Sequence, residues 1–187
     1  MAQTPLPRPH VNVLFSANQI AARIATLADA IVEKAPRNLL VVPVLKGSFI
    51  FAADLVRALH HAGLTPEIDF MTLGSYGTGT TSSGEVRVVQ DVSAELAGRG
   101  VLIVDDILET GRTLAHAKMS VLERGASHVT TCVLLNKPVA RATAISADLK
   151  AFDCPDVFVV GYGMDLAHRY RELPFVGQLV ENSSERD

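Results

Sequence analysis

Apolar positions along the chain recur with two periods, one typical of helices and one typical of buried strands. Helical spacing begins after a capping-box pair, Ser16 and Gln19, and continues to Lys34. The same spacing returns over 49–61 and 112–124. We therefore expect a helix in each of these three segments.

Short apolar or alternating runs between these segments predict strands. They cover residues 39–45, 67–73, 86–90, 101–104, 128–135 and 157–160. Runs that are apolar throughout are typical of strands buried on both faces of a parallel sheet. Pro43 interrupts the first run, and because proline cannot donate a ladder hydrogen bond, we expect that strand to end or bulge there. Strands that alternate with helices of this length indicate an α/β fold with a mostly parallel central sheet flanked by helices.

The composition fits one compact domain. The 187 residues are 48% hydrophobic and 20% charged, and no Pro/Gly/Ser-rich linker divides them. A net charge of −3 without a basic cluster argues against nucleic acid as the main partner. No apolar run approaches the ~20 residues that span a membrane, and residues 1–10 lack a signal-peptide core. We therefore expect a cytoplasmic protein with no membrane partner, in which Cys132 and Cys154 are free thiols.

The most specific chemistry lies in residues 101–114, VLIVDDILETGRTL. An apolar strand runs into Asp105 and Asp106, and the segment 110–113 (TGRT) then opens a helix. The carboxylates can accept hydrogen bonds from vicinal sugar hydroxyls, and the N–H groups, hydroxyls and cation at the helix N-terminus suit a phosphate. A helix cap with a solvated neighbour is the alternative for the two carboxylates. The P-loop pattern GxxxxGK[ST] does not occur, which excludes that class of phosphate site.

Charged residues follow the ends of several predicted strands. They are Lys46, Asp105, Asp106, Lys137 and Asp165. Because ligands of parallel α/β sheets bind at the carboxyl ends of the strands, we expect these residues to share one site.

At these residues the chain resembles the type I phosphoribosyltransferases and, more narrowly, the hypoxanthine/guanine phosphoribosyltransferase family. The resemblance covers about Phe15 to Leu173. The matching segments are 105–113 for phosphoribosyl pyrophosphate (PRPP), 44–48 for the pyrophosphate loop, 74–76 for a mobile catalytic loop, 134–137 for a base-reading lysine, 158–165 for purine stacking and metal, and 170–173. It implies the type I phosphoribosyltransferase fold, with a core of about 37–137 and a small hood from about 1–36 and 138–187. It also implies a homodimer or homotetramer.

The resemblance implies a purine-salvage reaction, the transfer of the 5-phosphoribosyl group from PRPP to N9 of hypoxanthine or guanine. The products are IMP or GMP and pyrophosphate. The residues that it assigns to PRPP are Lys46, Gly47, Asp105, Asp106, Thr110, Gly111, Arg112, Thr113 and Arg171. It further implies a non-proline cis peptide in the pyrophosphate loop. For Lys46 a plain surface lysine, and for Arg171 a solvated basic face, remain the alternatives.

For the base, the resemblance implies that Phe158 stacks on the purine, Val159 offers a backbone group and Lys137 donates to the 6-oxo oxygen. Adenine presents a 6-amino donor at that place and should be a poor substrate. Asp165 is the implied protein ligand of Mg²⁺, which would neutralise the departing pyrophosphate. The alternatives are a core position for Phe158 and a capping role for Asp165.

Catalysis is assigned to Glu109, Ser75 and Tyr76. Glu109 departs from the family, which usually has aspartate at this position to handle the N7 proton of the purine; we expect glutamate to serve still. Ser75 and Tyr76 resemble the loop pair that closes over the reacting centre, with a plain surface loop as the alternative. The histidines, His168 among them, show no convergent ligand spacing, so we interpret them as surface or core residues.

Two other functions stay open. A xanthine-preferring relative would differ at position 2 of the ring, which the sequence does not resolve. A regulatory module that senses PRPP or nucleotides could keep the turn at 105–113 while losing Lys46, Tyr76 or Lys137. All three of these residues are present.

Overall fold

The structure of the protein is a computed structural model that describes residues 10–36, 38–75, 86–139 and 142–180. In chain order the elements are β1 (His10–Phe15), α1 (Ala17–Lys34), β2 (Leu40–Leu45), α2 (Phe49–His61), β3 (Glu67–Ile68), β4 (Met71–Ser75), β5 (Val86–Gln90), β6 (Gly100–Leu108), α3 (Arg112–Glu123), β7 (His128–Asn136), β8 (Leu149–Asp153), β9 (Val159–Val160) and β10 (Val176–Val180).

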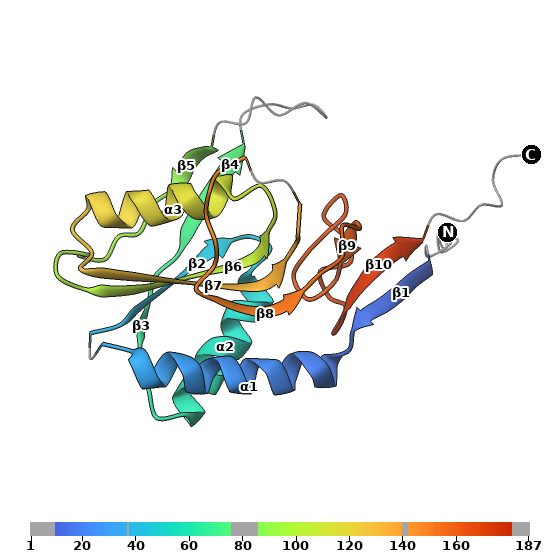
Figure 1. Cartoon of the computed structure of the whole chain (residues 1–187), viewed down its shortest axis with the longest axis horizontal. Coiled ribbons are helices and arrows are strands. Elements are labelled where there is room, and N and C mark those ends of the chain that lie inside the picture. The colour runs from blue at the N-terminus through green and yellow to red at the C-terminus, as the bar shows by residue number, and fades with distance from the viewer. Residues whose placement is uncertain (1–9, 37, 76–85, 140–141, 181–187) are drawn as a thin grey trace, which may run out of the picture.

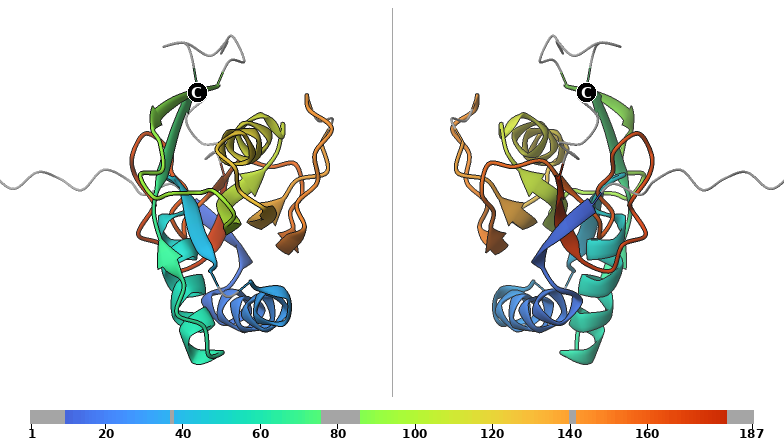
Figure 2. Two further views of the ribbon diagram at one scale, coloured as in Figure 1. Left: turned by 90° about the vertical axis from the view of Figure 1, so that its left-hand side faces the viewer. Right: turned by 90° about the vertical axis from the view of Figure 1, so that its right-hand side faces the viewer.

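The larger of two sheets follows the order β5-β4-β2-β6-β7-β8, with β3 paired to β2. The pairs of β2 with β3, β4 and β6, of β6 with β7 and of β7 with β8 are parallel, whereas β4 and β5 are antiparallel. α1 and α2 cover one face of this sheet and α3 covers the other (Figure 1). Figure 2 shows these layers from two sides. The expected α/β fold with a mostly parallel sheet flanked by helices is confirmed.

Neighbouring residues of the central strands point to opposite faces of the sheet. Val41 and Leu102 pack with the apolar side chains of α1 and α2, whereas Leu40 and Ile103 pack with those of α3. All four side chains are at most 1% exposed. Two buried faces explain why these strands read as continuous apolar runs instead of alternating ones.

The helices begin and end close to the expected positions. At the start of α1, the Ser16 backbone N–H donates to Gln19 Oε1 (2.9 Å) and the Gln19 N–H donates to Ser16 Oγ (3.4 Å), which completes the capping box. Gly63 follows α2 in the left-handed region, with φ of +95°. Among the residues that the structure describes, no helix is both long enough and apolar enough to cross a membrane.

A smaller antiparallel sheet joins the two ends of the described chain. Its strand order is β1-β10-β9, and His10 pairs with Val180. It lies beyond the carboxyl ends of β2, β6 and β7 (Figure 1), as expected for a hood built from the terminal segments. The division of the chain near 37 and 137 stays a prediction; β8 lies beyond residue 137 yet pairs with β7 in the larger sheet.

The prediction that β2 ends or bulges near Pro43 is wrong. Pro43 pairs in register with Val104 of β6, and β2 continues to Leu45. On its other side β2 pairs with β3 up to Val41 and with β4 only from Val44 onward. The Asp69 N–H donates to the Val41 carbonyl (3.1 Å) on that side, so Pro43, two residues later, turns its nitrogen to the same side. The missing donor therefore falls in the gap between two partner strands.

The expectation that Asp105 and Asp106 follow a strand ending at Val104 also needs correction. β6 continues through both carboxylates to Leu108, because β7 runs beside it as far as Asn136. The strand expected over 67–73 is divided into β3 and β4, and the strand expected over 157–160 is reduced to β9.

Asp69 ties the break between β3 and β4 to the loop before β6. Its carboxylate accepts hydrogen bonds from the N–H of Phe70 (2.8 Å), the N–H and Oγ of Ser93 (2.7 and 2.8 Å) and the N–H of Ala94 (2.9 Å). Partial burial opposes ionisation, but the hydrogen bonds from Ala94, Ser93 and Phe70 outweigh it and lower the pKa of Asp69.

We predict that Asp69→Asn lowers the free energy of unfolding by about 1 kcal/mol at pH 7, because a neutral amide replaces a carboxylate that accepts several donors. A carboxyl group with a lowered folded-state pKa stabilises the fold above its unfolded-state pKa. The difference between wild type and variant should therefore shrink as the pH falls from 3.8 through the lower folded-state pKa. Urea unfolding at several pH values measures it, with Asp29→Asn on the exposed face of α1 as the control. A difference that is constant with pH would contradict the assignment.

Candidate active site

A cleft of about 680 Å³ opens at the carboxyl edge of the larger sheet, under the smaller sheet. Its lining comes from the loop after β2, from β4, from the ends of β6 and β7, and from the segment on either side of β9. The predicted site residues that line it are Lys46, Gly47, Asp106, Glu109, Lys137, Phe158, Val159, Asp165 and Arg171. The positions of Lys46, Asp106, Lys137 and Asp165 after successive strands predicted this convergence. Asp105, also expected in the shared site, is buried and does not belong to the lining.

The loop after β2 is held tightly against β6. A cis peptide bond joins Leu45 to Lys46, as the resemblance implied for this loop. The fully buried Ser48 donates its hydroxyl to the Val44 carbonyl at 2.6 Å. A Cβ atom on Gly47 would lie 1.6 Å from Oδ2 of Asp106. Only glycine therefore lets this loop approach the carboxylate so closely.

Asp105 and Asp106 are two adjacent carboxyl groups whose burial is only partly offset by hydrogen bonds. The Asp106 N–H donates to Asp105 Oδ1 (3.0 Å) and the Ile107 N–H donates to Asp106 Oδ1 (2.9 Å). Burial raises the pKa of Asp105 well above its ordinary value, and the charge of Asp106 adds to this. Burial also raises the pKa of Asp106, although the side-chain hydrogen bond with Asp105, the hydrogen bond from the Ile107 N–H and, least, the charge of Arg171 oppose the change. Such carboxylates are well suited to take hydrogen bonds from hydroxyls or to stabilise positive charge.

The segment 110–113 leads from the cleft into α3. Gly111 is the N-cap residue of α3 with φ of +81°, and it makes no side-chain cap. The first turn of α3 has no acidic residue, so its N–H groups are available to an anion. A Cβ atom on Gly111 would lie 2.7 Å from Ile145 Cγ2, so both the backbone conformation and the packing favour glycine. None of the four residues Thr110, Gly111, Arg112 and Thr113 belongs to the lining of the cleft itself.

Glu109 and Lys137 form an ion pair across the ends of β6 and β7. Lys137 Nζ lies 3.2 Å from Glu109 Oε1. The lysine side chain is 7% exposed and the glutamate side chain 47% exposed, so a buried ammonium reaches a carboxylate at the cleft mouth. The Lys137 N–H donates to the Leu108 carbonyl (3.0 Å), which fixes the backbone next to Glu109.

The segment around β9 supplies the opposite wall. Phe158 is 55% exposed, so the core position considered for it is wrong, whereas the neighbouring Val159 is buried. Arg171 binds Asp165 Oδ1 through Nη2 (2.7 Å) and donates Nη1 to the Gly163 carbonyl (2.6 Å). Asp165 Oδ2 accepts the His168 N–H (2.8 Å), so Asp165 does cap a turn, the alternative considered for it, while it also faces the cleft.

Ser75 and Tyr76 were expected near the cleft, and His168 was not. Ser75 ends β4, and its side chain, like all of Tyr76, lies outside the described residues. His168 was interpreted as a surface or core residue, but it contributes to the lining of the cleft. Its position three residues after Asp165, in a tight turn, is the signal that could have revealed it.

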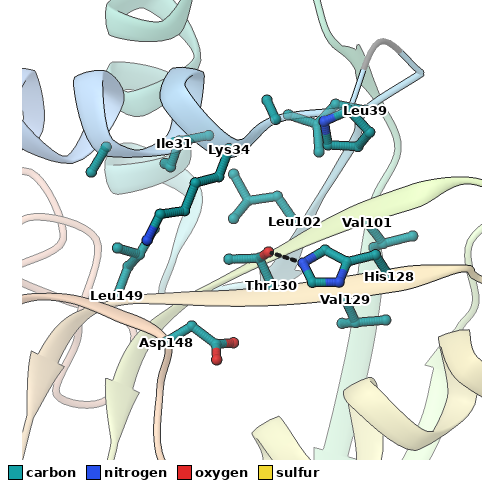
Figure 3. Close-up of a pocket in the computed structure, with 13 residues that line it drawn as sticks. Ile31, Lys34, Leu39, Val101, Leu102, His128, Val129, Thr130, Asp148 and Leu149 are labelled. Carbon is teal, nitrogen blue, oxygen red and sulfur yellow. Dashed lines mark hydrogen bonds between the residues drawn. The ribbon is translucent and has the colours of Figure 1, made fainter.

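A second cavity, of about 300 Å³, lies at the amino ends of β6 and β7. Lys34 extends across it from α1 toward Leu149 (Figure 3). Thr130 Oγ1 and His128 Nε2 form a hydrogen bond at its floor (3.2 Å). None of the predicted site residues lines it, so the cleft at the carboxyl edge is the candidate active site.

Comparison with known proteins identifies close relatives over nearly the whole chain. Residues 10–167 match the family model described as the phosphoribosyl transferase domain. The chain is 43% identical over 179 residues to the hypoxanthine phosphoribosyltransferase of Haemophilus influenzae, which covers 94% of this chain and 98% of the relative. It is 39% identical over 171 residues to the hypoxanthine-guanine phosphoribosyltransferase of Dictyostelium discoideum, with 90% and 95% covered. Among solved structures, the hypoxanthine phosphoribosyltransferase of Trypanosoma cruzi in complex with its product IMP is similar, with a TM-score of 0.83, 34% identity, and 95% and 97% of the two chains covered.

We predict that Gly47→Ala leaves the protein folded but weakens binding of magnesium pyrophosphate by about tenfold. Gly47 has no left-handed φ, so alanine can adopt its backbone, but the new methyl group would force the Asp106 carboxylate aside. Calorimetric titration measures the binding, and urea unfolding should show a stability within about 1 kcal/mol of wild type. Unchanged binding would mean that the close contact between this loop and Asp106 has no functional role.

Proposed function

The chain belongs to the phosphoribosyl transferase family, and we propose that its cleft transfers the 5-phosphoribosyl group of PRPP to N9 of hypoxanthine or guanine. The products are IMP or GMP and pyrophosphate, so the protein is an enzyme of purine salvage. The observation that carries this proposal is the convergence in one cleft of a cationic loop, an acidic strand end, a buried lysine and an exposed aromatic ring.

In this reaction the bond between C1 of the ribose and the pyrophosphate oxygen breaks, and a bond from C1 to N9 forms. The sugar gains oxocarbenium character between the two events, so stabilisation of positive charge is needed at C1. Asp105 and Asp106 supply negative charge near C1 and accept hydrogen bonds from the ribose hydroxyls. Burial raises both pKa values, so hydrogen bonds from the ribose hydroxyls and positive charge on the sugar would stabilise the ionised forms that this role needs.

The two phosphate ends of PRPP go to different elements. The N-terminus of α3, with Thr110, Gly111, Arg112 and Thr113, takes the 5-phosphate through N–H groups and hydroxyls. Lys46, Gly47 and Arg171, which line the cleft, take the pyrophosphate. Holding both ends fixes C1 in line with the base, which is the main gain from orientation.

The base lies between Phe158 and the end of β7. Phe158 offers an exposed ring for stacking, Val159 a backbone group, and Lys137 a donor for the 6-oxo oxygen. The buried ammonium of Lys137 would face the 6-amino donor of adenine, which explains why we expect 6-oxopurines to be preferred.

Mg²⁺ fits the cleft as a substrate-held ion. Among the described residues, no three His, Cys, Asp or Glu side chains gather into a metal cage. Mg²⁺ commonly keeps its waters and combines one or two carboxylates with phosphate oxygens. Asp165 is the carboxylate that would hold it, since it lines the cleft and, with Oδ1 at Arg171 and Oδ2 at His168, keeps acceptor capacity on both oxygens. When bound, the ion neutralises charge on the departing pyrophosphate.

Glu109 would accept the N7 proton of the purine as the N9 bond forms. Its side chain pairs with Lys137, so the incoming 6-oxo oxygen competes with the carboxylate for the ammonium. Glutamate is one methylene longer than the aspartate that the family usually has here. This length lets the Glu109 carboxylate, the proton acceptor, contact the Lys137 ammonium, which binds the 6-oxo oxygen. The dimer or tetramer and the cytoplasmic location stay predictions.

The decisive experiment is a transfer assay with PRPP, Mg²⁺ and hypoxanthine, guanine, xanthine or adenine in turn. We expect turnover with hypoxanthine and guanine and little with adenine. A strong preference for xanthine would indicate the related enzyme class instead. No pyrophosphate release with any of the purines would favour a regulatory module that binds PRPP.

We predict that Glu109→Gln lowers kcat by about 10²-fold, because the amide cannot accept the N7 proton. The loss should be smaller in Glu109→Asp, which keeps the carboxylate, and this variant is the matched control. Steady-state kinetics with hypoxanthine at saturating PRPP measures both. Normal turnover by Glu109→Gln would show that another group handles the proton.

A further inference from the structure

A tight turn of three residues, Gly161-Tyr162-Gly163, connects β9 to the Asp165 segment. The turn closes with paired hydrogen bonds between the backbones of Gly161 and Met164, each 3.1 Å. All three residues have positive φ, of 93°, 50° and 102°. Tyr162 is the one residue of the three that has a Cβ atom, and the left-handed conformation is unfavourable for such a residue. Its side chain must therefore be held in place by its surroundings.

The backbone of this turn lies directly against the pyrophosphate loop. A Cβ atom on Gly163 would lie 2.2 Å from the carbonyl oxygen of Gly47. The Gly163 carbonyl in turn accepts Arg171 Nη1 (2.6 Å), and the Gly163 N–H donates to the Arg171 carbonyl (3.1 Å). A shift of the turn would therefore move Asp165, Arg171 and the loop at Gly47 relative to one another.

Tyr162 anchors the turn to α2, the helix that begins just after the pyrophosphate loop. Its ring is 6% exposed, and its hydroxyl donates to the carboxylate of Asp54, which also pairs with Arg57 on the same helix. Burial, reinforced by the hydrogen bond to Asp54, raises the pKa of Tyr162, so the hydroxyl remains a donor. The hydrogen bond thus joins the turn at 161–163 to α2, the helix that follows the pyrophosphate loop.

Neither residue belongs to the active-site cleft. Tyr162 and Asp54 instead line a separate apolar groove of about 600 Å³ between α1, α2 and the segment after Arg171. Any effect of this pair on the reaction must therefore pass through the residues that the turn carries.

We propose that Tyr162 and Asp54 are positioning residues that hold Asp165 and Arg171 in register with the pyrophosphate loop. The proposal rests on the function proposed above. It predicts a selective effect, because the base-binding residues are anchored differently: Val159 and Val160 pair with Gln178 and Gly177 of β10. Loss of the pair should weaken the magnesium–pyrophosphate end of the site and spare the purine end.

The test compares Tyr162→Phe, Asp54→Ala and the double variant with wild type. We expect each single variant to weaken binding of magnesium pyrophosphate and to raise KM for PRPP by about tenfold, the size of a hydrogen bond to a charged group. KM for hypoxanthine should change less than about twofold. The double variant should be no worse than either single one, because the same interaction is lost.

Arg57→Ala is the matched control. Arg57, the second partner of Asp54, has a side chain that is 70% exposed. Its removal leaves the hydrogen bond between Tyr162 and Asp54 intact, so binding of magnesium pyrophosphate should stay at the wild-type level. Asp54→Asn keeps an acceptor and should recover part of the loss.

Two results would overturn the proposal. One is a lower melting temperature for Tyr162→Phe with unchanged pyrophosphate binding, which would mark a purely structural bond. The other is an equal rise in KM for both substrates. Failure of the proposed function itself is separate, since the wild-type protein would then show no transfer with any 6-oxopurine.

Discussion

The unequal pairing of β6 with its two neighbours is the constraint on which the site depends. β2 pairs with β6 only as far as Pro43 and Val104, whereas β7 continues beside β6 to Leu108. Beyond Val104 one edge of β6 therefore has no pairing with β2, while the other edge stays paired with β7. Asp105 and Asp106 lie in that released stretch, and the loop that follows β2 turns onto it until Gly47 reaches the Asp106 carboxylate. Proximity between the acidic and cationic parts of the site follows from strand lengths.

The smaller sheet places the remaining groups over that edge. β1 and β10 come from opposite ends of the described chain, and β9 pairs with β10 next to them. Phe158 precedes this sheet at β9, and Asp165 and Arg171 lie in the connection that leaves β9 and returns to β10. Long-range pairing thus brings residues from the last quarter of the sequence to the ends of strands formed much earlier. The contact of Gly163 with the Gly47 carbonyl joins the two parts at backbone level.

The charged groups of the cleft are of two kinds, ion pairs and desolvated carboxyl groups. The cations reach carboxylates in two places, Lys137 at Glu109 and Arg171 at Asp165. Asp105 and Asp106 are instead desolvated, and this burial raises both pKa values; the charge of Asp106 adds to the rise at Asp105. A ligand with hydroxyl groups or developing positive charge would stabilise the ionised forms of these carboxyl groups. An anionic group would instead be attracted by the cations and the N-terminus of α3. One cleft can therefore accept both ends of a sugar phosphate.

Much of the fold and of the site could be predicted from the sequence because local signals agree with the final packing. Helical spacing and a capping box determined α1, apolar runs determined the buried strands, and the order of acidic, small and basic residues at 101–114 indicated sugar-phosphate chemistry. Strand limits were less predictable: Pro43 is tolerated because its nitrogen faces a gap between β3 and β4, and β6 runs past its carboxylates because β7 is long enough to pair with it. The ion pair of Lys137 with Glu109 and the hydrogen bond from Tyr162 to Asp54 left no trace in the sequence pattern. Residue types and local periodicity are properties of the sequence itself, but which side chains meet across 28 or 108 residues is decided only when the sheets close on one another.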